Sequence, residues 1–144
     1  MTNKTTPAVL RGAGLLAALS TGKPSAAAYE GLWLATQMWL QYGGGVPIER
    51  FAGLPKTGPA LAKASRDLWI RRAAQGLPAN TKYAQAYKLA EEFQTFTTRG
   101  PWRSWCESAH PPDEASELRT ALFYTAKFNG GELLSERTIY RALS

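Results

Sequence analysis

Short breaks rich in glycine and proline divide this chain into segments in which apolar residues recur every three or four positions. Such spacing puts the apolar side chains on one side of an α-helix, and no run of four or more residues alternates as a half-buried strand would. The breaks are Gly43 to Gly45, the three prolines between Val46 and Pro59, Gly76 to Pro78, Gly100-Pro101 and Gly130-Gly131. The pattern predicts an all-α protein.

The expected architecture is a single compact domain, residues 1–144, built as a bundle of five to seven helices. A length of 144 residues suits one domain, and an apolar content of 44% is enough for one core. The expected helices cover residues 7–21, 25–42, 59–75, 80–99, 113–129 and 135–143, with a short turn at 102–105. Asn80 and Asp113 are the predicted N-caps of the fourth and fifth long helices.

The second of these helices is apolar on all sides. Leu32, Trp33, Met38 and Trp39 surround its axis, which indicates either a central core helix or a contact with another subunit. The apolar stretch 26–42 includes Glu30, Gln37 and Gln41 and is at the lower limit of length for crossing a bilayer. We therefore expect no membrane association.

Positive charge is concentrated in the first half of the chain. Residues 1–75 hold nine Lys or Arg against three acids, whereas residues 76–144 hold eight of each. Six bases occur between positions 50 and 72 with only Asp67 among them: Arg50, Lys56, Lys63, Arg66, Arg71 and Arg72. A local excess of this kind attracts polyanions, so this stretch is the first candidate nucleic-acid-binding face. The alternative is an ordinary solvated helix face.

The C-terminal helical hairpin, residues 114–143, is a second candidate. Its last segment has Ser135, Arg137, Thr138, Tyr140 and Arg141 in an order that resembles the recognition helices of bacterial helix-turn-helix regulators. The resemblance implies that these five residues reach bases and phosphates. The turn is longer than in such motifs, and the charge of 117–144 is low, with four bases against three acids. The alternative is a hairpin that only buries its apolar side chains.

Residues suited to catalysis are few. The chain has one cysteine, Cys106, and one histidine, His110, and Pro111 disfavours the helical geometry that would pair them. No Gly-rich phosphate loop and no Cys/His cluster for zinc occurs in the sequence. We expect no enzyme activity, no cofactor and no metal. A lone cysteine excludes an intrachain disulfide framework, which is typical of a cytoplasmic protein.

These features favour a non-catalytic subunit that binds the backbone of RNA or single-stranded DNA inside a larger nucleoprotein assembly, with other protein subunits as neighbours. In general character the chain is similar to the small, basic, helical subunits of CRISPR effector complexes, an analogy of architecture and not of motif. The second hypothesis is a sequence-specific helix-turn-helix regulator of DNA. The third is a protein-interaction adaptor or inhibitor whose basic face meets an acidic protein.

Overall fold

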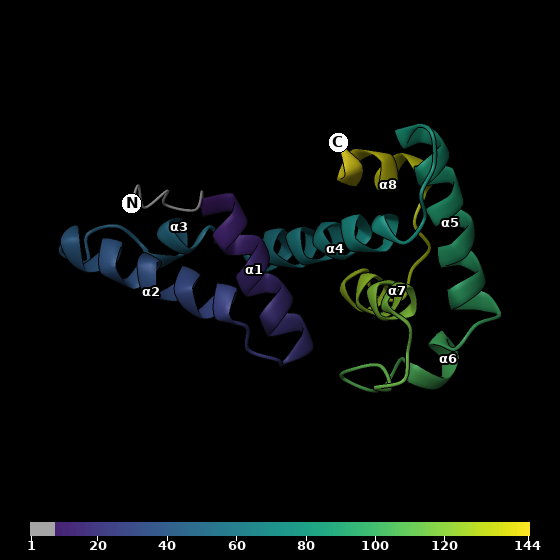
Figure 1. Ribbon diagram of the computed structural model, residues 1–144, viewed down its shortest axis with the longest axis horizontal. Helices are drawn as coiled ribbons and strands as arrows, with labels where there is room; N and C mark the ends of the chain where they lie inside the picture. Colours follow the sequence, from purple (N-terminus) through teal and green to yellow (C-terminus); the bar gives the residue numbers. More distant parts are fainter. Residues whose placement is uncertain (1–7) are drawn as a thin grey trace. The chain divides into compact units, whose positions relative to one another are not determined.

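A computed structural model describes residues 8–144, with side chains from Gly12 onward, and confirms the all-α class (Figure 1). The predicted start of the first helix at Pro7 lies outside this range. Eight helices occur within it, more than the five to seven predicted, because two short ones join the long ones: α1 Ala8–Thr21, α2 Ala26–Gln41, α3 Ile48–Ala52, α4 Gly58–Gln75, α5 Lys82–Thr98, α6 Trp102–Trp105, α7 Glu117–Phe128 and α8 Glu136–Leu143. No strand is present in the part of the chain that is described.

Hydroxyl side chains cap five of the described helices; Thr57 Oγ1 accepts from the amide of Ala60 at the start of α4. Ser25, Thr81, Ser116 and Ser135 each have extended backbone angles and accept a hydrogen bond from the amide three residues later. The predicted caps Asn80 and Asp113 are therefore wrong by one and three residues. A capping side chain needs a residue in extended conformation directly before the first helical turn, and Thr81 and Ser116 occupy that place. Neighbouring cap-forming residues make this choice difficult from sequence alone.

Residues Ala62–Ser144 form one compact unit around helix α7. Six consecutive residues of α7, positions 121–126, are buried, so this helix is enclosed on all sides. Helices α4, α5 and α8 (Figure 1) each contribute apolar side chains to the same buried core. The buried core side chains are Trp69, Ile70, Ala73, Ala74, Ala86, Leu89, Phe93, Phe96, Ala121, Leu122, Phe123, Tyr124, Ala126, Ile139 and Ala142.

Residues 8–61 form a second compact unit that contains α1, α2 and α3. Its buried apolar cluster is small: Leu15, Ala28, Ala35 and Ala52, with Ala18, Phe51 and Leu54 packed against it. Helix α2 buries its small residues and leaves large ones exposed, so it is not the central core helix of this unit. Within residues 8–144, no helix is both long and apolar enough to cross a membrane.

Helix α1 passes very close to the turn after α3. A Cβ atom added to Gly12 would collide with the carbonyl oxygen of Gly53, a residue held in the left-handed region at φ 70°. We expect Gly12→Ala to destabilise this unit by about 1–3 kcal/mol, since the backbone must shift. Gly14→Ala is the matched control, because nothing lies within 4 Å of its added Cβ. Hydrogen exchange of the amides between residues 12 and 54 measures both effects, and equal protection in the two variants would contradict this packing.

Candidate nucleic-acid interface

The six bases predicted to form one face are divided between the two units. Arg50, in the last turn of α3, and Lys56, in the following loop, belong to the first unit, and both are exposed. Lys63, Arg66, Arg71 and Arg72 lie on α4 within the second unit. These four α4 residues differ in whether their charged groups already contact other residues of the protein.

Arg66 is committed to contacts within the protein. Its Nε and Nη2 donate to Oδ1 of Asp67 at 3.0 and 2.9 Å, and its Nη1 donates to Oδ1 of Asn129 at 3.4 Å. This is the one ion pair found among the described residues, and both side chains are mostly shielded from solvent. Arg66 therefore has little free charge to offer a phosphate.

Arg72 stacks on a buried aromatic ring. Its guanidinium carbon lies 5.0 Å from the centre of the Trp69 ring, while the residue as a whole stays exposed. Helical spacing puts Arg72 on the same side of α4 as the buried residues Leu68 and Trp69, and the stacking explains how a cation is accommodated there. Lys63 is exposed near the start of the same helix.

Arg71 connects α4 to the C-terminal helix. Its Nη1 donates to the backbone oxygen of Ala142 at 3.2 Å, near the end of α8. A guanidinium has five N–H donors, so this single bond fixes the position of the group and leaves most donors available. Arg71 is exposed, so its positive charge lies at the protein surface beside the end of α8.

The exposed side of α8 presents two further arginines and a tyrosine. Arg137, Tyr140 and Arg141 are exposed, whereas Ile139 and Ala142 are buried in the core. Positions 137 and 141 lie one turn apart on the same side of a helix. Within the described chain, no hydrogen bond or ion pair engages either guanidinium.

Helix α5 adds a fourth cation next to this side of α8. The Lys82 ammonium lies 5.9 Å from the centre of the Tyr140 ring. We call the set Arg71, Lys82, Arg137, Tyr140 and Arg141 the α8 basic surface. It brings together one residue from the predicted basic stretch, three from the predicted hairpin site, and one that neither prediction included.

The other two predicted DNA-reading residues have a structural role. Ser135 Oγ accepts a hydrogen bond from the amide of Thr138 at 3.2 Å, and the two hydroxyls share a hydrogen bond of 3.0 Å. This arrangement caps α8 at its start. Both hydroxyls therefore help to begin the helix, and their polar atoms already have partners.

A groove beside the start of α8 is acidic. An open groove of about 350 Å³ runs between α5 and the segment that leads into α8, and its lining includes Glu91 and Glu136 but no base. A hydrogen bond to Glu91, together with the negative charge of that carboxylate and of Glu136, raises the pKa of the Tyr87 hydroxyl. Glu136 lies one turn before Tyr140 on the same side of α8, so the negative potential of this groove repels phosphate from the start of the helix.

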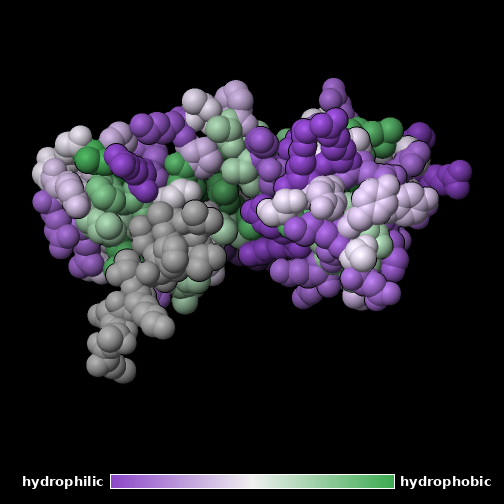
Figure 2. Space-filling model, turned by 90° about the horizontal axis from the view of Figure 1, so that it is seen from above, coloured by the Kyte–Doolittle hydropathy of each residue, from purple (hydrophilic) through white to green (hydrophobic). Residues whose placement is uncertain are grey.

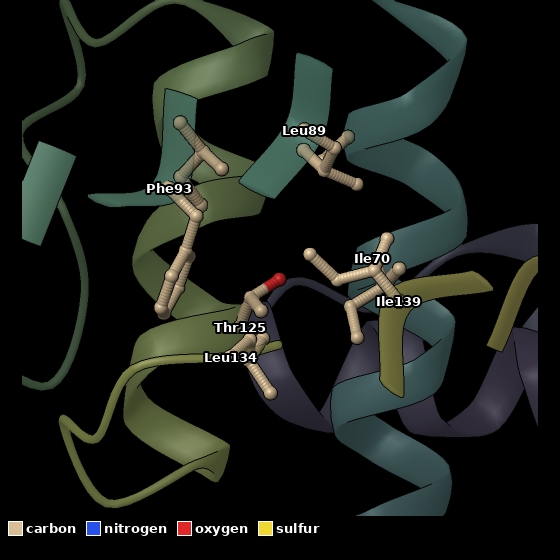
Figure 3. Close-up of a pocket in the computed structure, with 8 residues that line it drawn as sticks. Ile70, Leu89, Phe93, Thr125, Leu134 and Ile139 are labelled. Carbon is tan, nitrogen blue, oxygen red and sulfur yellow. The ribbon is translucent and has the colours of Figure 1, made fainter. Parts of the chain in front are cut away.

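The interior of the second unit contains a narrow apolar gap with no room for a water molecule (Figure 3). Ile70, Leu89, Phe93 and Ile139 point toward it from α4, α5 and α8. It is a gap in core packing and has neither the volume nor the polar groups of a ligand site.

His110 and Cys106 have separate partners. The Nδ1 atom of His110 and the hydroxyl of Tyr124 share a hydrogen bond of 2.9 Å, whereas Cys106 Sγ donates to the backbone oxygen of Arg103 at 3.5 Å. The described residues include no group of three or more His, Cys, Asp or Glu placed to hold a metal ion. These contacts give no arrangement of nucleophile, base and orienting group.

Burial raises the pKa of the Tyr124 hydroxyl above its ordinary value of 10.0. In the unfolded chain this tyrosine ionises first, so unfolding releases its proton and the stability of the fold decreases as the pH rises above about 10. We expect the difference in tyrosinate absorbance between the protein and Tyr124→Phe to appear only above that pH. A difference curve centred at or below the ordinary tyrosine value would contradict the burial of this hydroxyl.

Lys82 is the residue of the α8 basic surface that sequence analysis missed. It stands at the start of α5, far from α8 along the chain, and only the packing of the two helices brings it to Tyr140. Its place in a first helical turn, where bases are unfavourable, is the one signal that was available.

The chain matches no protein-family model, and no curated protein or solved structure is significantly similar to it.

Proposed function

We propose that this protein is a non-catalytic subunit that binds the sugar-phosphate backbone of a nucleic acid through the α8 basic surface, within a larger nucleoprotein assembly. The observation that carries the proposal is the hydrogen bond from Arg71 to Ala142, because it joins a cation of the basic stretch to those of the C-terminal helix. Three helices thus supply four exposed cations, of which Lys82 lies over the exposed ring of Tyr140. Such a surface is suited to phosphates, with the ring available to stack on a base.

The arrangement favours backbone contacts over base reading. Helix α8 has eight residues, its core side is held by Ile139 and Ala142, and the hydroxyls of Ser135 and Thr138 are used in its cap. Glu136 lines the acidic groove at a position where a helix-turn-helix motif has a buried aliphatic residue. Arginines on an exposed helix face contact phosphates of any sequence, so we expect binding that tolerates sequence changes.

Fluorescence anisotropy with labelled single-stranded RNA, single-stranded DNA and duplex DNA tests this function. If all four cations contact phosphates, affinity should decrease roughly 50- to 150-fold between about 50 and 200 mM salt. Similar affinity for unrelated sequences supports the proposal. A strong preference for one duplex sequence would instead favour the helix-turn-helix regulator, and no binding at low salt would favour the protein-interaction module.

A further inference from the structure

Helix α2 carries its large apolar side chains on the outside. Tyr29, Leu32, Trp33 and Leu40 are 74%, 47%, 57% and 65% exposed, respectively. Positions 29, 33 and 40 recur at helical spacing and so share one side of α2, with position 32 beside them. The space-filling view shows hydrophobic residues at the surface of the part of the molecule that contains α2 (Figure 2). Contiguous exposed apolar surface of this kind marks an interaction site.

The unit that contains α2 has little apolar interior of its own. Three of the four buried residues in its cluster are alanines, and the inner side of α2 is formed by Ala28, Gly31 and Ala35. Units of about 60 residues are marginal even with a full core, and many obtain further burial by association. Among the described residues of this unit, four of the seven exposed large hydrophobic side chains belong to this face of α2.

The charge of α2 narrows the class of partner. Residues 26–41 contain no Lys or Arg and a single acid, Glu30. A helix that lies on a lipid surface carries bases along its polar face, and a groove for single-stranded nucleic acid places cations beside its aromatic rings. Neither feature is present on this helix, so the face is suited to an apolar protein surface.

We propose that the partner is the same face of a second copy, with the two α2 helices antiparallel. An isologous contact requires a self-complementary face, and antiparallel pairing brings Tyr29 next to Leu40 of the other copy while it places the two Glu30 carboxylates at opposite ends. The four side chains offer on the order of 500 Å² per copy for burial, which approaches the smaller specific interfaces. The dimer presents two α8 basic surfaces, one from each chain.

Sedimentation velocity of the full chain from about 1 to 100 µM tests this proposal. We expect a monomer that converts to a dimer over this range. The double variant Trp33→Glu/Leu40→Glu should raise the dissociation constant at least about 100-fold, because it places charges in the centre of the interface. The matched control Tyr83→Glu/Leu133→Glu alters two equally exposed apolar residues of the other unit and should leave the dimer unchanged.

Hydrogen exchange locates the contact independently of these variants. Raising the protein concentration should protect the amides of α2 and leave those of α7, Glu117–Phe128, unchanged. A protein that remains monomeric at 100 µM overturns the proposal. It is also overturned by a dimer that persists in Trp33→Glu/Leu40→Glu, or by concentration-dependent protection confined to other helices.

Discussion

Replacement of Phe93 by alanine is expected to lower the free energy of unfolding of the unit Ala62–Ser144 by about 3–5 kcal/mol. Phe93 is 1% exposed and packs in the centre of the core. Its ring also lines the narrow cavity between α4, α5, α7 and α8, so its removal enlarges a gap that already exists. The surrounding helices are held by other buried side chains and have little freedom to close that space, so the cost of the cavity remains.

Denaturant unfolding followed by circular dichroism measures this loss. Tyr83→Ala is the control on the same helix, because Tyr83 is 66% exposed and its truncation should change stability by less than about 0.5 kcal/mol. Equal midpoints for the two variants would show that Phe93 is not enclosed, and the described packing of α5 against α7 would then be wrong.

The second large effect concerns binding. Charge reversal at Arg71, Arg137 and Arg141 is expected to weaken nucleic-acid binding at least about 100-fold at low salt, because three phosphate contacts are replaced by repulsion. The double variant Arg137→Glu/Arg141→Glu keeps the bond from Arg71 to Ala142 and should lose most of the affinity as well. It therefore separates loss of charge from any loosening of α8.

The matched control reverses three other arginines of the same unit. Arg99, Arg103 and Arg119 are exposed and lie outside the α8 basic surface, so their replacement by glutamate changes the net charge by the same amount. We expect only a modest decrease in affinity, caused by the weaker long-range field. If the two triple variants bind equally weakly, net charge alone governs binding and the α8 basic surface has no special role.

The helical class and most helix boundaries could be predicted from sequence because their determinants are local. Helices α5 and α7 have apolar residues on a regular spacing and are closed by Gly100 and Gly130, and the structure places both where the pattern does to within a few residues. The short helix α3 lies inside a segment interrupted by three prolines, where the sequence allowed only one turn. Five residues bounded by Pro47 and Gly53 leave too little periodicity to identify a helix.

The state of each charged side chain could not be predicted, because it depends on neighbours that are distant in the chain. Arg66 and Arg71 both belong to the predicted basic stretch, yet one is held by Asp67 and Asn129 and the other is directed to Ala142. Lys82 joins Tyr140 only through the packing of α5 on α8. A count of local charge gives the same weight to a base in an ion pair and to a base exposed for a ligand.

The sequence left open whether α2 is a core helix or an interface. Its mean apolar content suits both, and the decision depends on which side the small residues occupy. Ala28, Gly31 and Ala35 allow close approach of the other helices of their unit, so the larger side chains remain outside. A helix that is apolar on all sides can thus bury the side with its small residues and expose the side with its large hydrophobic residues.

Two-dimensional amide NMR spectra of the full chain, recorded while a mixed-sequence single-stranded oligonucleotide is added at low salt, test the proposed binding surface most directly. We expect the largest chemical-shift changes in α8, Glu136–Leu143, and around Arg71 and Lys82. Shifts that instead concentrate around Arg50 and Lys56, or along the acidic groove beside Glu91, would contradict the α8 basic surface as the nucleic-acid contact.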